Sequence, residues 1–150
     1  MTNSRLNRRW VSVLALPAIA ATLVACGGGS SEPDGPIPLY AGTYFVVLNK
    51  TVDNCNSGVP NRLEILQTVS QSGRNLTMTS NDVVLQGQVD PDNLGISVSA
   101  QAVDNGVLVT TGVVYRASNV EGLFGAGLSV VGDAGNVRCT VAYNGQAQLQ

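Results

Sequence analysis

The sequence predicts an all-β domain, an antiparallel meander of about eight or nine strands. Three observations support this prediction: apolar and polar residues alternate with a period of two, turn residues interrupt the pattern at short intervals, and no helical periodicity is visible after residue 40. Such a meander can form a small β-barrel, closed or partly open, which we favour; full closure removes the edges of the sheet. A β-sandwich of two packed sheets is the alternative.

In the first half of this domain, each predicted strand is an apolar run bounded by turn residues. These runs are 41–50, 63–69, 76–78 and 83–89. Residues 51–61 form a long loop that contains Cys55. Ser72-Gly73 predicts a turn, and Asp90-Pro91-Asp92-Asn93 predicts another, because proline and short polar side chains favour chain reversal.

The second half continues the alternation. In the clearest strand, Leu94, Ile96, Val98 and Ala100 face one way and polar residues face the other. Asn105-Gly106 predicts a two-residue hairpin turn, in which both central residues need a positive φ. The later runs are 107–115, the glycine-rich 120–130 and 137–143, after which Asn144-Gly145 predicts a turn into a short C-terminal strand.

Cys55 and Cys139 are the two cysteines of the domain, and we expect them to form a disulfide. An even number of cysteines in an exported chain is typical of disulfide bonding. Cys139 also alternates with apolar residues, so we place it on the inward face. The alternative is a redox or metal site with two free thiols, which lacks both a CxxC spacing and any histidine.

The chain contains no histidine, so it cannot form a Ser-His-Asp triad, a Cys-His pair or the common zinc ligand sets by itself. Its carboxylates stand singly in turns or on polar strand faces, outside any recognisable catalytic frame. Carboxylate-only catalysis would have to use Glu64, Glu121, Asp82, Asp90 or Asp92. We therefore expect no catalysis, no metal and no cofactor. Downstream of residue 25, five basic residues face ten acidic ones, so nucleic acid is not an expected partner.

The N-terminus has the layout of a secretory signal, in which three arginines precede an apolar run over residues 10–25. That run ends in Leu23-Val24-Ala25-Cys26, which resembles the lipobox of bacterial lipoproteins. The resemblance implies that residues 1–25 are a signal peptide. It also implies that Cys26 carries a diacylglycerol and, after cleavage, an acyl chain such as palmitate. The alternative is an ordinary signal peptide that leaves Cys26 as a free thiol.

The same resemblance implies the domain organisation and the location. Residues 26–39 are rich in Gly, Ser and Pro and form a flexible tether, and residues 40–150 form one domain. Two or three acyl chains hold a protein on a membrane essentially permanently, so the membrane is the expected partner. Gly27, where some lipoproteins have Asp, implies sorting to the outer membrane of a bacterium with two membranes.

Gly42-Thr43-Tyr44 is similar to the Gly-x-aromatic opening of lipocalin-like and fatty-acid-binding barrels. Small barrels can hold one small ligand, so our first functional hypothesis is a binding module for a small apolar molecule. We expect the interior to be lined by Tyr44 (or Phe45), Val98, Val109, Tyr115 and Phe124. The alternative is that these side chains merely fill the core.

The second functional hypothesis is a structural or interaction protein of the envelope. Its C-terminal run, residues 143–150, would then offer a free edge to which a partner protein adds a strand.

Overall fold

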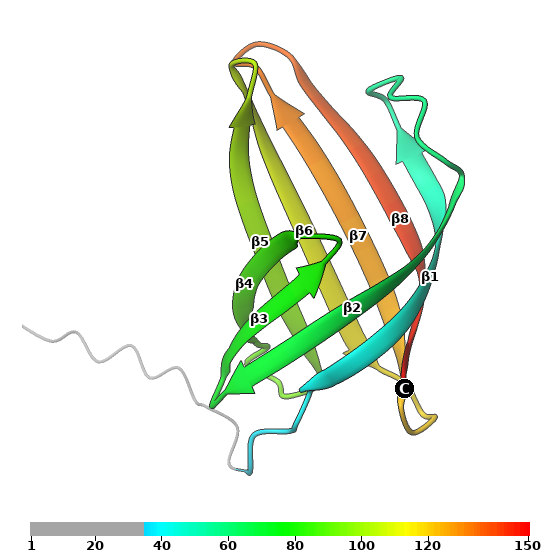
Figure 1. Ribbon diagram of the computed structural model, residues 1–150, viewed down its shortest axis with the longest axis vertical. Helices are drawn as coiled ribbons and strands as arrows, with labels where there is room; N and C mark the ends of the chain where they lie inside the picture. The colour runs from blue at the N-terminus through cyan, green and yellow to red at the C-terminus, as the bar shows by residue number, and fades with distance from the viewer. Residues whose placement is uncertain (1–34) are drawn as a thin grey trace, which may run out of the picture. The chain divides into compact units, whose positions relative to one another are not determined.

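The computed structural model describes residues 35–150 and shows eight antiparallel strands that close into a barrel in sequence order (Figure 1). The strands are β1 (Gly42–Asp53), β2 (Arg62–Ser72), β3 (Asn75–Ser80), β4 (Val83–Val89), β5 (Gly95–Asp104), β6 (Val107–Ala117), β7 (Leu123–Asp133) and β8 (Arg138–Leu149). The predicted antiparallel barrel is therefore confirmed, and the sandwich is excluded. The predicted signal peptide, Cys26 and most of the predicted tether lie outside the described residues. Residues 35–150 contain no helix of the length and apolarity needed to cross a membrane.

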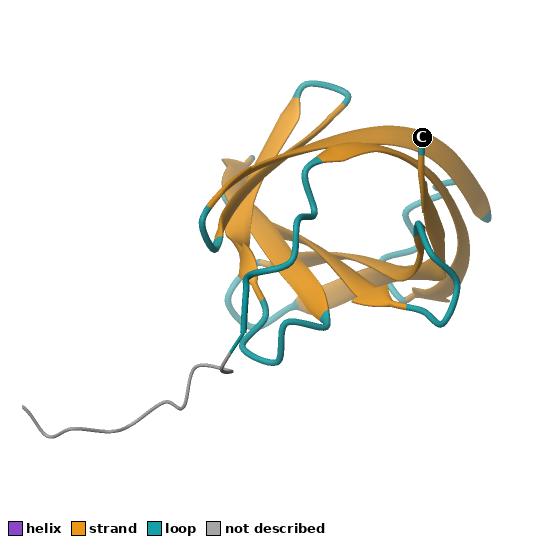
Figure 2. Ribbon diagram, turned by 90° about the horizontal axis from the view of Figure 1, so that it is seen from below, coloured by secondary structure: helices purple, strands orange, loops and turns teal. Residues whose placement is uncertain are grey.

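Alternation along each strand separates interior from outer side chains. In β1, Tyr44, Val46 and Leu48 are buried, whereas Thr43 and Phe45 between them are exposed. Figure 2 shows the strands arranged as a ring. The same division holds along the other strands: inward positions are mainly apolar, and the polar residues at outward positions are mostly Thr, Ser, Gln and Asn. The pleat produces this division because successive side chains point to opposite faces of a strand.

The hairpin turn predicted between β5 and β6 is confirmed. Asn105 and Gly106 have φ values of 49° and 82°, and Asp104 pairs with Val107 on either side of them. Positive φ at both central residues matches the right-handed twist of the flanking strands. This turn therefore follows from local chemistry alone.

The turn predicted at Asn144-Gly145 is wrong, because both residues lie within the continuous strand β8. Gly145 pairs with Leu48 of β1, and a Cβ built on Gly145 would overlap the backbone carbonyl of Val47. The glycine is thus needed for a close approach of two strands and not for chain reversal.

The free edge predicted at residues 143–150 is also wrong. Over Tyr143–Gln148, β8 pairs with β1 on one side and with β7 on the other. Closure of the barrel is the reason, since it joins the last strand to the first and gives this part of β8 a neighbouring strand on both sides.

Strands β3 and β4 are short, with 6 and 7 residues, whereas the other strands have 10 to 12. As a result, β2 pairs with β3 only from Thr68 onward, and β5 pairs with β4 only up to Ser99. Among the described residues, 62–67 of β2 and 100–104 of β5 therefore have a ladder partner on one side only. We call the half of the barrel that contains these segments the open half (upper part of Figure 1) and the other the closed half.

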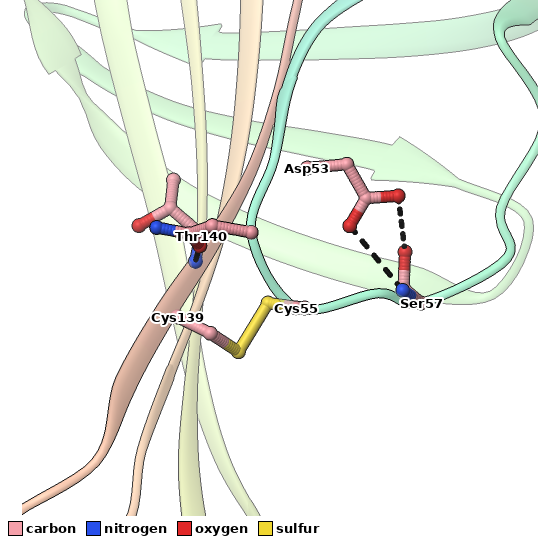
Figure 3. The surroundings of a disulfide bond; sticks show 6 residues. Asp53, Cys55, Ser57, Cys139 and Thr140 are labelled. Atoms are coloured by element: carbon pink, nitrogen blue, oxygen red, sulfur yellow. Dashed lines mark hydrogen bonds between the residues drawn. A yellow bond between two sulfur atoms is a disulfide. The ribbon is translucent and has the colours of Figure 1, made fainter.

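The predicted disulfide between Cys55 and Cys139 is confirmed (Figure 3). Cys55 lies in the β1–β2 loop (residues 54–61), Cys139 lies near the start of β8, and their Cα atoms are 4.9 Å apart. The bridge therefore joins the loop to the far end of the sequence, 84 residues away. All strands, their ladder partners and this bridge lie within residues 42–149, so the segment 35–150 contains every element that the barrel needs to fold.

We predict that replacing both cysteines, Cys55→Ala with Cys139→Ala, lowers the free energy of unfolding of the segment 35–150 by about 2–4 kcal/mol, because the unfolded chain loses a long cross-link. Urea unfolding followed by circular dichroism measures the difference. Reducing agent should destabilise the wild type by a similar amount and leave the double variant unchanged. Equal stability of the oxidised wild type and the double variant would contradict the prediction.

Candidate functional site

The interior of the closed half is filled by aromatic side chains. Tyr44 lies 5.2 Å from Tyr115 and 5.6 Å from Phe124, measured between ring centroids, and Tyr40 lies 5.9 Å from Phe124. Tilted and edge-to-face contacts of this kind are favourable for aromatic rings. Met78 and Ile96 complete the packing without measurable exposure. This half therefore serves as the hydrophobic core.

Tyr40 also closes the end of this core. Its backbone N–H donates to Gln71 Oε1 at 2.7 Å, and its hydroxyl donates to the carbonyl of Asn93 at 2.9 Å. Gln71 in turn donates to the carbonyl of Pro38 at 2.9 Å. The chain that leads into β1 is thus held against the β2–β3 and β4–β5 connections, and it covers the closed end.

The buried hydroxyls of the core have partners. Tyr44 donates to the carbonyl of Tyr40 at 2.8 Å, and Tyr115 donates to Oε1 of Gln67, which is itself buried. Burial raises the pKa of Tyr44 to about 12 and also raises the pKa of Tyr115. Both phenols are therefore neutral at physiological pH.

The open half contains a cavity of about 550 Å³. Its wall is mainly aliphatic: Leu63, Val107, Val109, Leu128, Val130 and Val141. Valine is much smaller than the tyrosine and phenylalanine at the corresponding positions of the closed half, so the interior is not filled here. The exposed residues Ser57, Asp104 and Asn105 also border the cavity and mark its mouth.

The β1–β2 loop forms one wall of the cavity and is held in place at several points. The disulfide fixes Cys55, and the Asn54 N–H donates to the carbonyl of Thr140 at 3.1 Å. Farther along, the Tyr143 hydroxyl donates to the carbonyl of Pro60 at 2.9 Å. These contacts connect the loop to β8 from both its beginning and its end, so the cavity wall is preformed.

Asp53 and Lys50 secure the same loop. Asp53 accepts hydrogen bonds from the backbone N–H and the hydroxyl of Ser57, at 3.3 and 3.0 Å (Figure 3). Lys50 Nζ lies 3.0 Å from Asp53 Oδ2 and donates to the carbonyl of Val59 at 2.9 Å. The hydrogen bond from Lys50 is the main cause that lowers the pKa of Asp53, followed by the bond from the Ser57 backbone. Lys50 is therefore occupied in holding the loop.

Of the five residues predicted to line a ligand site, the structure places only Val109 at the cavity. Tyr44, Tyr115 and Phe124 come together in the closed half, and Val98 is buried in the core. Sequence reasoning missed Leu63, Leu128 and Val130 as wall residues. A signal that could have located the cavity exists along β6: the inward residues at one end are the small Val107 and Val109, whereas the large Tyr115 stands near the other end.

The carboxylates singled out in the sequence are mostly engaged in ion pairs. At the closed end, Arg116 Nη1 lies 3.1 Å from Asp90 and 2.9 Å from Asp92. Ser97 donates a further hydrogen bond to Asp90 Oδ1, while the buried Asp90 Oδ2 makes no hydrogen bond and has only the ion pair with Arg116. Glu64 is bound by Arg62 on the outer surface. In residues 35–150, no group of three metal-ligating side chains comes together.

Comparison with models of known protein families, with curated proteins and with solved structures found no match.

We predict that Tyr115→Phe lowers the free energy of unfolding by about 1–3 kcal/mol, because it leaves the buried Gln67 amide without its partner. Gln67→Leu alone should also lower the free energy of unfolding, because it leaves the buried Tyr115 hydroxyl without its acceptor. In the double variant the two effects should not add, since neither partner is left unsatisfied. Urea unfolding of the four proteins measures this coupling, and strictly additive losses would show that the hydrogen bond does not contribute.

Proposed function

We propose that the protein is a lipid-anchored, non-catalytic lipoprotein of the bacterial cell envelope whose barrel binds a small apolar ligand. The cavity of the open half is the observation that supports ligand binding. Its volume of about 550 Å³ lies in the range of small-molecule sites, and its wall is mainly aliphatic with a few polar groups at the mouth. A preformed wall also favours binding because little order must be created when the ligand enters.

Two features of the chain support membrane attachment through lipid. The Leu23-Val24-Ala25-Cys26 motif provides the acylation site, and Gly27 favours the outer membrane as the destination. In contrast, the outward positions of the strands are mainly polar, whereas a bilayer-spanning barrel has an apolar outer band. This distribution supports a barrel that stands in water and is held at the membrane by acyl chains on Cys26.

A second candidate function is strand addition by a protein partner in the envelope. The one-sided segments of β2 and β5 favour it, because unpaired backbone groups can accept another strand. Residues 101–104 of β5 are exposed, so a partner would have access to them.

For ligand binding, we predict that the segment 35–150 binds the neutral apolar dye N-phenyl-1-naphthylamine and increases its fluorescence. Val109→Phe should weaken this binding by about ten-fold or more, because the larger side chain occupies the cavity. Leu108→Phe is the matched control, since Leu108 is the outward neighbour on the same strand and is 40% exposed. An absence of dye binding, or equal binding by the Val109→Phe protein, would contradict the prediction.

For the anchor, we predict that the full chain expressed in a two-membrane bacterium incorporates labelled palmitate and that Cys26→Ala abolishes the incorporation. The variant should also keep its signal peptide and migrate as a larger protein. The Cys55→Ala, Cys139→Ala double variant is the matched control and should retain the label. Equal labelling of the wild type and the Cys26→Ala protein would exclude lipidation at this residue.

A further inference from the structure

We propose that the ligand of the open-half cavity is an uncharged molecule, with an apolar body and at most a neutral polar end such as a hydroxyl group, and that ionised carboxylates are rejected. This inference rests on the proposed function and names the chemical class of its ligand.

The wall of the cavity offers no positive charge. Among the residues that border it, Asp104 has the only charged side chain, and Cys55 and Cys139 are bonded to each other. The remaining polar groups are Ser57 and Asn105 at the mouth and the Tyr143 hydroxyl, whose proton is given to the carbonyl of Pro60. Ser57 Oγ already donates to Asp53 and Asn105 Nδ2 to Asp104, so the donors at the mouth are occupied by carboxylates, whereas the side-chain oxygens of Ser57 and Asn105 can accept a hydrogen bond from a neutral hydroxyl group.

Each basic residue of the described chain is directed elsewhere. In the closed half, Arg74 donates to the carbonyls of Val89 and Asp90, and Arg116 pairs with Asp90 and Asp92. In the open half, Lys50 is bound to Asp53 and to the loop carbonyl of Val59.

The other two basic residues lie on the outer surface. Arg62 pairs there with Glu64 and is followed by Leu63, which faces inward. Arg138 is exposed and is followed by the inward Cys139. Within residues 35–150, no cation therefore borders the cavity.

The consequence for a ligand follows from the cost of burial. An ionised carboxylate that leaves water without a partner loses far more solvation free energy than a hydroxyl group, which can exchange hydrogen bonds with Ser57 or Asn105. Asp104 and the excess of acidic residues in the domain add repulsion to an approaching anion. A long-chain alcohol and the ionised acid of the same length therefore differ in the charge of the polar end, which is the property that we expect to decide binding.

The test compares 1-dodecanol with dodecanoate at neutral pH as competitors for N-phenyl-1-naphthylamine bound to the segment 35–150. We expect dodecanol to displace the dye and dodecanoate to require a concentration about ten-fold or more higher. Displacement by dodecanoate at an equal or lower concentration would overturn the inference while leaving the proposed binding function in place. Failure of the dye and of both competitors to bind would overturn the two together.

A charge-reversal variant tests whether the preference for dodecanol over dodecanoate depends on the charge at the cavity mouth. Asp104→Lys should reduce the difference between the two competitors several-fold by improving the affinity for dodecanoate alone. Glu121→Lys makes the same change in net charge on the exposed β6–β7 connection of the closed half and should leave the difference unchanged. Equal effects of the two variants would show that the overall charge, and not the cavity mouth, governs selection.

Discussion

The ladder between β1 and β8 is the interaction on which the rest of the barrel depends. It runs from Tyr44 opposite Leu149 to Asp53 opposite Val141, with one irregularity between Lys50 and Val52. Without it, the first and last strands would be open edges and the apolar inner face would be exposed to water. Gly145 permits the close approach of the two strands, and the disulfide adds a covalent bond where this seam reaches the β1–β2 loop. The backbone and the cysteines thus secure the same closure.

The interior of the barrel is filled in the closed half and hollow in the open half. Aromatic rings and Met78 fill the closed half, where burial of large apolar side chains provides most of the hydrophobic stabilisation. Valines line the open half and leave a cavity, which lacks those contacts and therefore lowers stability relative to a filled core. One half thus maintains the fold while the other contains a cavity, and the contacts of the β1–β2 loop with β8 keep the wall of that cavity in place.

Most features that the sequence predicted correctly are local ones; the disulfide is an exception, and it could be predicted because the domain has only two cysteines to pair. Period-two alternation depends only on the pleat of a single strand, and Asn105-Gly106 forms its turn through its own φ preferences. Asn144-Gly145 has the same composition, yet it lies in mid-strand because the neighbouring strand β1 approaches Gly145 closely. The residues that border the cavity differ from the predicted ones for a related reason: whether an inward residue such as Val109 or Tyr115 lies against empty space depends on which residues of other strands stand at the same height. Register across the barrel determines this, and a single sequence does not reveal it.

The chain enters the barrel through Tyr40 at the closed half, while Ser57 and Asn105 mark the mouth of the cavity at the opposite end. Strands of 10 to 12 residues separate these two points by roughly 30 Å. A pulling force on the segment that leads into Tyr40 therefore acts first on the filled end of the barrel, and the wall of the cavity lies outside its direct path.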